Sequence, residues 1–337
     1  MKKTIKTGIL SFGTSGKIFH APFLNEHSGF ELYAVVERNK KNAQLYYPHI
    51  KSYDSVDAFL ADPEIELVIV NTPNATHFEF ALKAIKANKH VLVDKPFTVS
   101  SSQAKQLFQE AKKHNRFILP YQNRRYDSDF LSVKTIIDSG KLGKLVEAHI
   151  RFDRYRYSIG PKVAKETTVP GSGLMYDLGP HLLDAAISLF GNPLSWEKTK
   201  GYFRPNTQVD DYAHIHLKYP KGLQVFITMS MLLAHVQPAF IINGTKGSFI
   251  KQRADVQEKQ LMDGMRLTNP LYGIEDHEKK GILTTILDDG NKKQEKIKAV
   301  KSSYSNAFDA VYKTIREGHS YTISEQQIIQ QLEILEA

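Results

Sequence analysis

The chain contains no cysteine among its 337 residues, which excludes disulfide bonds, thiol catalysis and cysteine-ligated zinc or iron–sulfur sites. It also has no apolar run near the ~20 residues that a membrane-spanning helix requires. Lys2 and Lys3 open the chain, but Lys6 and Gly8 interrupt the apolar stretch that follows, and no small-residue cleavage site comes after it. We therefore interpret this segment as a first strand rather than a signal peptide, and expect a cytoplasmic protein with no membrane partner.

Acidic residues are fewer than basic ones, 36 against 45, which gives a formal net charge of +9. The lysines occur as scattered pairs, such as Lys40-Lys41 and Lys112-Lys113, and form no stripe interleaved with aromatic residues. The sequence contains no nucleic-acid-binding motif, so we expect a solvated surface and no nucleic-acid partner. A basic surface would still favour the capture of a polyanionic dinucleotide.

Strand-like and helix-like segments alternate through the first 121 residues. Such alternation is typical of a parallel sheet with helices on both faces. We therefore predict an α/β domain with a doubly wound parallel sheet over residues 1–121. The predicted strands are 5–12, 31–37, 67–70, 89–93 and 117–121, and the predicted helices end near residue 27 or span 54–61 (capped by Asp54), 76–88 and 100–115.

From residue 122 onward, strand-like segments follow one another with only turn residues between them. This pattern favours an antiparallel sheet, so we predict that residues 122–337 form an α+β domain with a mostly antiparallel open sheet. The segment 256–280 is polar and receives no assignment. The predicted strands are 144–154, 197–203, 212–219, 223–231, 239–243 and 248–252, and the predicted helices are 127–139, 182–190, 304–317 and 324–336.

A glycine loop follows the first predicted strand and precedes a predicted helix. Its sequence, Ser11-Phe12-Gly13-Thr14-Ser15-Gly16-Lys17, approximates G-x-G-x-x-G with serine at the first glycine position. Such a loop makes a tight turn and leaves the backbone bare enough for a pyrophosphate to approach the helix N-terminus. An ordinary strand-to-helix turn is the alternative. A Walker phosphate loop is disfavoured because Ile18, rather than serine or threonine, follows Lys17.

The second predicted strand ends at two residues with opposite preferences, Glu37 and Arg38. An acidic residue about 20 positions beyond the glycines binds the ribose hydroxyls of NAD, whereas an arginine there accommodates the 2′-phosphate of NADP. The local sequence leaves the choice between the two cofactors open.

Chemistry-bearing residues occur in two further places. Lys95 follows a buried strand and would point into the crevice where parallel sheets bind ligands; a surface lysine is the alternative. Asp177 and His181 are four residues apart, so on a helix they share one face. Pro180 is expected in a first helical turn, which predicts a helix start near Asp177. A helix cap and a satisfied core histidine are the alternatives, and a metal site is disfavoured because no third ligand lies at helical spacing.

Two polar segments lie where strands are predicted to end. Asn71-Thr72-Pro73-Asn74 follows the short buried strand predicted at 67–70, where it would contact a cofactor or simply form a turn and helix cap. Asn123-Arg124-Arg125 follows the last strand of that domain, where the arginines would bind substrate or form interdomain salt bridges.

These segments together resemble the Gfo/Idh/MocA family, named for glucose–fructose oxidoreductase and inositol dehydrogenase. The resemblance covers nearly the whole chain, and the variants present here resemble a branch that includes NADP-dependent scyllo-inositol dehydrogenases. Two departures are Ser11, in place of the first glycine, and Asp94, in place of the glutamate of E-K-P. The motifs are Lys17-Ile18-Phe19-His20-Ala21-Pro22-Phe23, Thr72-Pro73-Asn74 with His77, Asp94-Lys95-Pro96, Arg124-Arg125-Tyr126-Asp127, and Gly173 with Asp177-Leu178-Gly179 and His181.

The resemblance implies an N-terminal Rossmann domain and a C-terminal domain whose open sheet commonly makes the oligomer interface, so a homodimer or homotetramer is expected. It implies NADP as cofactor, with NAD not excluded, and a polyol or sugar-like substrate. It gives Lys95, Asp177 and His181 catalytic roles, with His181 as acid and base. The implied cofactor contacts are Phe12, Gly13, Thr14, Gly16, Lys17, Glu37, Arg38, Asn71, Thr72, Pro73, Asn74, His77, Asp94 and Lys95, and the implied substrate contacts are His20, Asn123, Arg124, Tyr155, Asp177 and His181.

The sequence thus predicts an NAD(P)-dependent oxidoreductase that interconverts a hydroxyl and a ketone. Substrate choice would reside in the segments 154–169 and 204–211. Relatives of this fold also include non-catalytic regulators that sense a dinucleotide or sugar, and NAD-dependent glycosidases. A proton-transferring set of lysine, aspartate and histidine disfavours the regulator, since a sensor has no need of one.

Overall fold

The computed structural model describes residues 4–160, 166–276 and 280–336. Its contacts divide the chain into two compact units. Unit 1 comprises Met1–Asn123, Glu258–Tyr272 and Tyr304–Glu336, and unit 2 comprises Arg124–Gln257 and Gly273–Ser303. Unit 1 therefore takes in two later segments that the continuous range 122–337 had assigned to the second domain.

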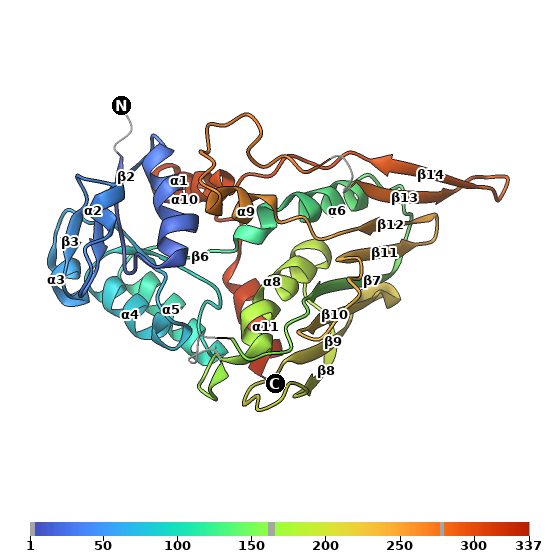
Figure 1. The fold of residues 1–337 in the computed structure, drawn as a ribbon, viewed down its shortest axis with the longest axis horizontal. Coiled ribbons are helices and arrows are strands. Elements are labelled where there is room, and N and C mark those ends of the chain that lie inside the picture. The colour runs from blue at the N-terminus through green and yellow to red at the C-terminus, as the bar shows by residue number, and fades with distance from the viewer. Residues whose placement is uncertain (1–3, 161–165, 277–279, 337) are drawn as a thin grey trace. The chain divides into compact units, whose positions relative to one another are not determined.

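Unit 1 is built on a six-stranded parallel sheet with strand order β3-β2-β1-β4-β5-β6 (Figure 1). β1 pairs with both β2 and β4, so the strand order reverses between β1 and β4. This is the topological switch point at which open α/β sheets bind ligands. The strands are β1 (Ile5–Ile9), β2 (Phe30–Val36), β3 (Lys51–Tyr53), β4 (Leu67–Val70), β5 (His90–Val93) and β6 (Ile118–Pro120).

Helices cover both faces of this sheet (Figure 1). α1 packs on β2 and on α10, whereas α4 packs on β4, β5 and α5. The strands between them are apolar on both sides, as a doubly covered parallel sheet requires. The helices of unit 1 are α1 (Ala21–Glu26), α2 (Ala43–Tyr46), α3 (Val56–Ala61), α4 (His77–Lys86), α5 (Ser101–Lys113), α10 (Ser305–Glu317) and α11 (Glu325–Glu336), with α9 (Val256–Met262) at the boundary of the units.

The two C-terminal helices join unit 1 through specific contacts. The ring of Phe308 in α10 stacks on Phe23 of α1 at 5.3 Å between centroids. α11 packs on α5, where Lys105 binds Glu333 at 2.8 Å, and the Glu336 carboxylate accepts a hydrogen bond from the backbone amide of Ser101. These contacts explain why the end of the chain groups with the parallel sheet.

Unit 2 is built on an eight-stranded sheet with strand order β14-β13-β12-β11-β7-β10-β9-β8. All neighbours are antiparallel except β7 and β10, which confirms the predicted mostly antiparallel sheet. The strands are β7 (Leu145–Asp153), β8 (Ser195–Gly201), β9 (Tyr212–Lys218), β10 (Gln224–Ser230), β11 (Phe240–Gly244), β12 (Gly247–Lys251), β13 (Gly281–Ile286) and β14 (Lys292–Ile297), and the helices are α6 (Ser128–Asp138) and α8 (Gly173–Phe190).

One face of the unit 2 sheet packs on helices, and Figure 1 shows α6 and α8 on the same side of it. The buried strand residues, such as Ile150, Ile215 and Ile227, alternate with partly exposed ones. The alternation places one set toward the helices and the other on the opposite face, as expected of a sheet covered on one side.

The helix that carries Asp177 and His181 starts earlier than predicted. α8 begins at Gly173, and Pro180 lies inside it rather than in its first turn. Gly173 has a φ of +87°, and a Cβ there would lie 2.2 Å from the Asp210 carboxylate. That carboxylate accepts a hydrogen bond from the amide of Met175 at 2.6 Å and thereby caps the helix. The cap comes from a distant residue, so local spacing gave no sign of it.

Other boundaries also differ from the prediction, for reasons that the structure shows. β1 ends at Ile9 rather than residue 12, because the carbonyl of Ser11 turns to accept a hydrogen bond from Asn71. The cap of α3 is Ser55, whose hydroxyl accepts from the amide of Ala58, rather than Asp54. β3, β13 and β14 were not predicted; β3 is short, and β14 is polar up to its last residue, Ile297.

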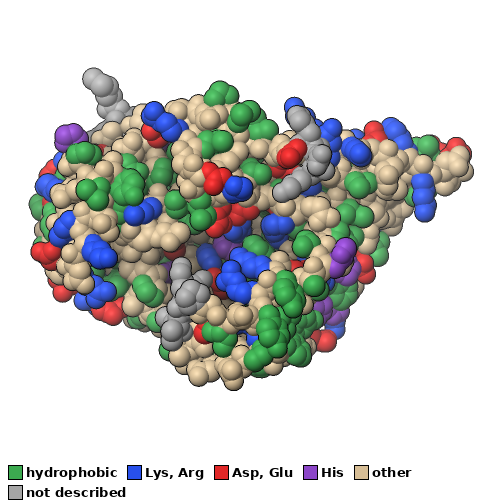
Figure 2. All heavy atoms as spheres, in the orientation of Figure 1, with side chains coloured by type: hydrophobic (Ala, Val, Ile, Leu, Met, Phe, Trp, Pro, Cys, Tyr) green, Lys and Arg blue, Asp and Glu red, His purple; other side chains and the backbone are tan. Residues whose placement is uncertain are grey.

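Within the described ranges, no helix is long and apolar enough to cross a membrane. Figure 2 shows lysine and arginine side chains scattered over the viewed face with acidic side chains among them.

Candidate functional site

The predicted cofactor residues of unit 1 gather at the carboxyl edge of the parallel sheet. The glycine loop follows β1, Glu37 follows β2, Asn71 follows β4 and Asp94 follows β5. β1, β4 and β5 are adjacent strands, so three of these loops are neighbours at the switch point. The fold therefore brings together the loops that the sequence analysis selected.

The glycine loop has the geometry that a dinucleotide pyrophosphate requires. Gly16 has no room for a side chain, since a Cβ would lie 2.2 Å from the carbonyl oxygen of Ser11. The side-chain amide of Asn71 donates to that same oxygen at 2.8 Å and closes the turn. Gly13 and Thr14 are exposed and lead into a π-helical turn at Gly16–His20. The bare, exposed backbone ahead of this turn fits a pyrophosphate.

His77 connects the loops after β4 and β5. Its Nδ1 lies 2.7 Å from the carbonyl oxygen of Pro96, and its Nε2 lies 2.8 Å from that of Thr72. Burial lowers the pKa of His77, against the opposing effect of the nearby Asp94 carboxylate. His77 is 1% exposed, so it shapes the cofactor edge from beneath. Pro73 and Asn74 lie at the surface of the same loop.

Asp94 is held by two residues of the glycine-loop segment. Its Oδ1 lies 2.8 Å from Nε2 of His20, and its Oδ2 accepts a hydrogen bond from the hydroxyl of Ser15 at 2.6 Å. His20 has no exposed surface. The structure therefore places His20 in the interior of unit 1, where it supports the loops, rather than at a surface open to substrate.

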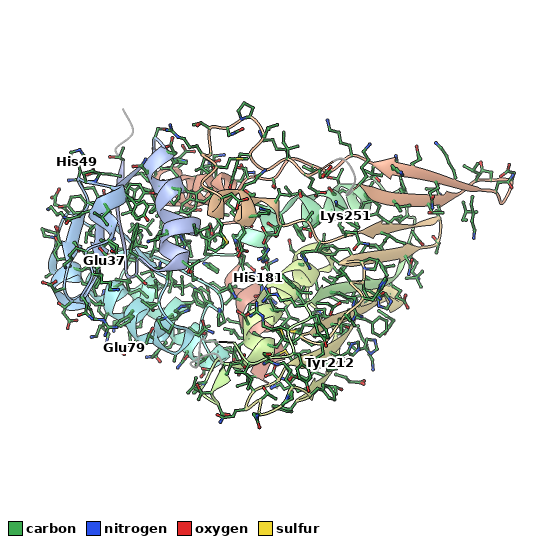
Figure 3. All side chains as sticks on the ribbon, viewed as in Figure 1. Glu37, His49, Glu79, His181, Tyr212 and Lys251 are labelled. Atoms are coloured by element: carbon green, nitrogen blue, oxygen red, sulfur yellow. The ribbon has the colours of Figure 1, made fainter. Side chains whose placement is uncertain are left out.

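Glu37 is committed to the backbone of its own loop. Its Oε1 and Oε2 accept hydrogen bonds from the amides of Asn42 and Ala43 at 3.0 and 3.1 Å, at the start of α2. The residue is 9% exposed and lies at the end of β2 (Figure 3). Arg38, by contrast, is exposed. Each oxygen of this carboxylate thus accepts one backbone hydrogen bond, which holds the Glu37 side chain against the start of α2.

An aromatic cluster lies beside the glycine loop. The ring of Phe12 is 6.0 Å from that of Tyr46, and the ammonium group of Lys17 lies 5.5 and 4.8 Å from their respective centroids. Tyr46 is 62% exposed. The cation–π contacts hold the Lys17 side chain over this cluster, at the junction of the glycine loop and α2.

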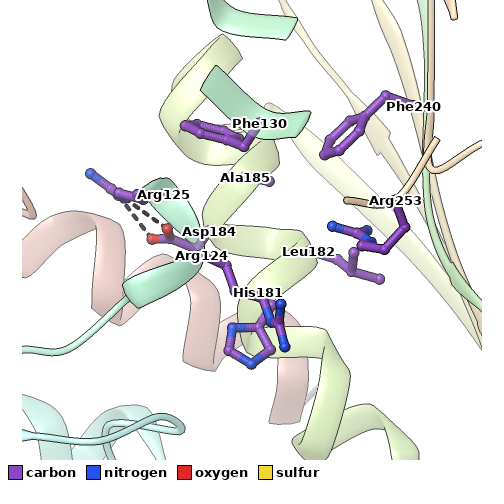
Figure 4. A pocket seen from close by; sticks show the side chains of 9 residues that line it. All are labelled: Arg124, Arg125, Phe130, His181, Leu182, Asp184, Ala185, Phe240 and Arg253. Atoms are coloured by element: carbon purple, nitrogen blue, oxygen red, sulfur yellow. Dashed lines mark hydrogen bonds and ion pairs between the residues drawn. The ribbon is translucent and has the colours of Figure 1, made fainter. Parts of the chain in front are cut away.

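In unit 2, His181 and Asp184 lie on α8 and line a small pocket (Figures 3 and 4). His181 is 9% exposed. The pocket is also lined by guanidinium groups, and Figure 4 shows that of Arg124 pointing toward the His181 ring. The full lining is Arg124, Arg125, Phe130, His181, Leu182, Asp184, Ala185, Phe240 and Arg253.

The two neighbouring arginines of this pocket form ion pairs within unit 2. Arg125 binds Asp184 through two hydrogen bonds, Nε to Oδ2 at 2.7 Å and a terminal nitrogen to Oδ1 at 2.8 Å. Arg124 donates to Asp127 at 3.0 Å and to Asp255 at 2.5 Å. These partners hold both guanidinium groups in place at the pocket, and Figure 4 shows only that of Arg124 beside the His181 ring.

Phe152 is surrounded by arginines. The guanidinium carbons of Arg124, Arg154 and Arg253 lie 5.3, 4.9 and 4.6 Å from its ring centroid. Arg154 also approaches the Asp177 carboxylate at 4.0 Å. The stacking limits the freedom of these side chains near α8.

The remaining predicted substrate residues differ in their exposure. Asp177 is 30% exposed at its side chain, Tyr155 is 63% exposed, and Asn123 is buried. Of the predicted substrate segment 154–169, residues 161–165 lie outside the described residues, as do residues 277–279 of the polar segment 256–280.

Ser15, Asp210 and Arg253 have contacts that were not predicted. Ser15 lies inside the recognised loop motif, so its hydroxyl was a detectable candidate. Asp210 lies in the predicted substrate segment 204–211, but neither its contact with Met175 nor the contacts of Arg253 carry a local signal, because the partners are distant in sequence. Among the described residues, no three side chains gather that would hold a metal ion.

Comparison with known proteins matches both parts of the chain. Residues 5–121 match an oxidoreductase family with an NAD-binding Rossmann fold, and residues 130–250 match the GFO/IDH/MocA C-terminal domain. An uncharacterized oxidoreductase of Schizosaccharomyces pombe is 38% identical over 99% of this chain and 96% of its own length.

Two further relatives extend the comparison. The protein named scyllo-inositol 2-dehydrogenase (NADP(+)) of Bacillus subtilis is 32% identical over 99% of this chain and 92% of its own length. The crystal structure of an oxidoreductase from Bacillus cereus superposes with a TM-score of 0.91 at 31% identity, covering 99% of this chain and 95% of that one. With its two sheets, its glycine loop and these full-length relatives, the chain belongs to the Gfo/Idh/MocA family of NAD(P)-binding oxidoreductases.

Proposed function

We propose that this protein is an NADP-preferring dehydrogenase or reductase that interconverts a hydroxyl and a ketone on a polyol, inositol or sugar-type molecule. The observation that carries the cofactor preference is the capping role of Glu37, whose two carboxylate oxygens accept from Asn42 and Ala43. These bonds hold the Glu37 carboxylate against the start of α2, and the neighbouring exposed Arg38 would contact a 2′-phosphate. The name of the Bacillus subtilis relative supports the same preference.

The cofactor would be held by the loops at the carboxyl edge of unit 1. Gly13, Thr14 and Gly16 would face the pyrophosphate with their backbone, as the absence of space for a Cβ at Gly16 supports. Phe12 and Lys17 would line the adenosine side. Residues 71–74 and Lys95 would complete the contact, with His77 holding the loops that carry them from beneath. When bound, the nicotinamide exchanges a hydride with the substrate carbon.

The protein's own groups would move the proton. His181 would take the hydroxyl proton in oxidation and return it in reduction, since an imidazole ring can both accept and donate a proton. Asp177 would hold a substrate hydroxyl and influence His181, and Lys95 would contact the reacting hydroxyl. Arg124, Asn123 and Tyr155 are the further side chains proposed to contact the substrate.

The test of this function is oxidation of scyllo-inositol and myo-inositol, and reduction of the corresponding ketones, with NADP(H) and NAD(H). Replacement of His181 by alanine should lower kcat by about 10²–10⁴-fold while the Kd for NADPH stays within about threefold of the wild-type value. His319→Ala is the matched control, because the side chain of His319 is 61% exposed. Near-normal kcat in the His181→Ala variant would refute its role.

We also propose that the protein is a homodimer or homotetramer formed through the face of the unit 2 sheet opposite α8. Phe226 is partly exposed there, between His149 and His216, whose rings lie 5.1 and 4.6 Å away. The same face carries charges of both signs, such as the pair of Lys218 and Glu197 at 2.6 Å. A patch of mixed charge around an aromatic ring is self-complementary, as a twofold interface requires.

Molar mass from light scattering tests this assembly. The wild-type protein should have a molar mass of two or four chains, and Phe226→Glu should lower it. Met262→Glu, at an exposed apolar residue of unit 1, serves as the control and should not change it. A monomeric wild-type protein would refute the proposed assembly.

A further inference from the structure

We propose that Asp94 is a positioning residue that ties the lysine loop, residues 94–96, to the glycine-loop segment, and so sets the place of Lys95. The inference rests on the proposed role of Lys95 in the reaction. It assigns to Asp94 a task inside the protein, in place of the direct cofactor contact expected from its position. All the residues whose contacts support it lie within unit 1.

The two contacts of Asp94 reach opposite ends of one short segment. Ser15 directly precedes the π-helical turn Gly16–His20, and His20 is its last residue. The Asp94 carboxylate spans both, with 2.6 Å to the Ser15 hydroxyl and 2.8 Å to the His20 ring. One side chain therefore fixes both the start and the end of the turn that follows the glycine loop.

His20 is itself immobilised, so the contact is a rigid one. Its ring has no exposed surface and lies 4.6 Å from the ring of Tyr121 and 6.1 Å from that of Phe308. The hydroxyl of Tyr121 in turn donates to the carbonyl oxygen of Phe19 at 2.9 Å. Packed rings of this kind leave the imidazole one orientation, which points its Nε2 at Asp94.

The other end of the lysine loop is held independently. The ring of His77 contacts the carbonyl oxygen of Pro96 at 2.7 Å and is 1% exposed. Asp94 and Pro96 flank Lys95, so two buried histidines from different elements hold the residues on either side of the lysine. The backbone of Lys95 is thereby fixed at both ends, while its side chain is partly exposed.

The charge state of Asp94 agrees with this task. Burial by itself would raise the pKa of Asp94, but His20 and the hydroxyl of Ser15 lower it below its ordinary value. The group is therefore a carboxylate at neutral pH, and it accepts strong hydrogen bonds from both partners. The shorter side chain, in place of the glutamate of E-K-P, is long enough for both contacts.

Placement of a reacting group matters because displacements of about 1 Å cost about 100-fold in rate. Loss of the Asp94 contact would let the lysine loop move relative to the glycine loop while both remain folded. The expected signature is a fall in kcat with little change in cofactor affinity, together with faster backbone exchange in the lysine loop.

The experiment compares Asp94→Ala and Ser15→Ala with a matched pair in the same unit. His27 and Asp309 have the same chemistry, with Nε2 to Oδ1 at 2.9 Å, but join α10 to the end of α1. Asp309→Ala therefore removes an equivalent contact elsewhere. Hydrogen–deuterium exchange of peptides containing residues 94–98 is measured without substrate, and kcat, KM and the Kd for NADPH are measured with it.

Asp94→Ala should speed exchange of the 94–98 peptide by about tenfold and lower kcat by about 10–100-fold, with the Kd for NADPH within about threefold of wild type. Ser15→Ala is a smaller change that leaves the contact between Asp94 and His20 intact. It should speed exchange of the 94–98 peptide and lower kcat by only a few-fold each. Added formate should restore part of kcat in Asp94→Ala only, because it has the size of the lost carboxylate and can occupy the vacated position between Ser15 and His20. Asp309→Ala should change none of these quantities in the lysine loop.

Unchanged exchange in both Asp94→Ala and Ser15→Ala would overturn the inference, as would an equal loss of kcat in Asp309→Ala. Faster exchange in a protein that oxidises no polyol would support the positioning contact while the proposed function fails. The two failures are therefore distinguishable. If Asp94→Ala does not fold, Ser15→Ala decides the outcome by the same measurements.

Discussion

The ammonium group of Lys251 and the carboxylate of Glu275 form an ion pair of 2.5 Å whose side chains are 0% and 1% exposed. The hydroxyl of Ser128, at the start of α6, donates to the other oxygen of the same carboxylate. The pair thus joins β12 to the loop before β13 and to α6, within unit 2 (Figure 3 labels Lys251). A buried charge pair of this kind makes the packing of the sheet on α6 sensitive to the loss of either partner.

Glu275→Ala should therefore destabilise unit 2 by about 3–5 kcal/mol, because it leaves the ammonium group of Lys251 without its buried counter-charge. Trp196, the single tryptophan of the chain, lies in β8 and reports unfolding of unit 2 by fluorescence in urea. The double variant Lys251→Met with Glu275→Leu should recover most of this loss. An unchanged urea midpoint in Glu275→Ala would show that the ion pair contributes little to the stability of unit 2.

The two glycines of the cofactor loop should respond differently to alanine. Gly16→Ala places a Cβ 2.2 Å from the carbonyl oxygen of Ser11 and should lower thermal stability and NADPH binding together. Gly13→Ala meets only the Ser11 hydroxyl, at 3.6 Å, so the fold should tolerate it. Its added methyl group should nevertheless weaken NADPH binding, because the backbone there would face the pyrophosphate. Thermal melts measure the loss of stability, and fluorescence titrations measure the loss of NADPH binding. Equal melting temperatures for the two variants would contradict the steric difference between Gly13 and Gly16.

Replacement of Arg38 by alanine should weaken NADPH binding by about 10–100-fold and leave NADH binding nearly unchanged, since a charged hydrogen bond to phosphate contributes about 1.5–3 kcal/mol. Glu37→Gln should lower stability by about 1 kcal/mol through loss of the cap on α2, without weakening NADH binding. Titrations with both cofactors test each variant. A selective loss of NADH affinity in Glu37→Gln would mean that Glu37 binds the ribose after all.

His90 should make unit 1 less stable at mildly acidic pH. Burial, with Arg116 and Arg316 nearby, lowers the pKa of His90 from its ordinary value of 6.5 to about 4. The unfolded chain therefore binds a proton that the folded chain does not as the pH falls from about 6.5 toward 4, and stability falls through this window by at most about 3 kcal/mol. Above pH 7 the group should have no effect on stability.

The matched variant is His90→Asn, which keeps an acceptor for the amide of Phe117, the partner of His90 Nδ1 at 3.0 Å. Urea unfolding followed by circular dichroism at pH 7.5 and pH 5 should show a smaller loss of stability in this variant than in the wild-type protein. Parallel losses in the two proteins would assign the effect to other groups.

The parallel sheet of unit 1 was predictable because an apolar segment marks each of its main strands, and a segment with helical periodicity comes after it. The edge strands of unit 2 were not: β14 has the sequence Lys-Lys-Gln-Glu-Lys-Ile and carries no alternation of apolar and polar residues. It is a strand because its backbone pairs with β13, and that partner could not be identified from the residues of β14 alone. The same holds for α8, whose start depends on Asp210.

The positions of the cofactor-edge loops were predictable from the strand ends, but the task of each side chain was not. Glu37 and Arg38 stand side by side in the sequence, and only the hydrogen bonds of Glu37 to Asn42 and Ala43 distinguish their roles. His20 lies in a recognised motif, yet its burial depends on Tyr121 and Phe308, far along the chain. Contacts between distant segments decide such cases.

The most direct test of this account is a titration of the wild-type protein with NADPH and with NADH, followed by nicotinamide fluorescence. The capping of Glu37 and the exposure of Arg38 predict that NADPH binds at least about tenfold more tightly than NADH. Tighter binding of NADH would contradict the cofactor assignment. Binding of neither would contradict the dinucleotide site itself, and the proposed oxidoreductase function would fail with it.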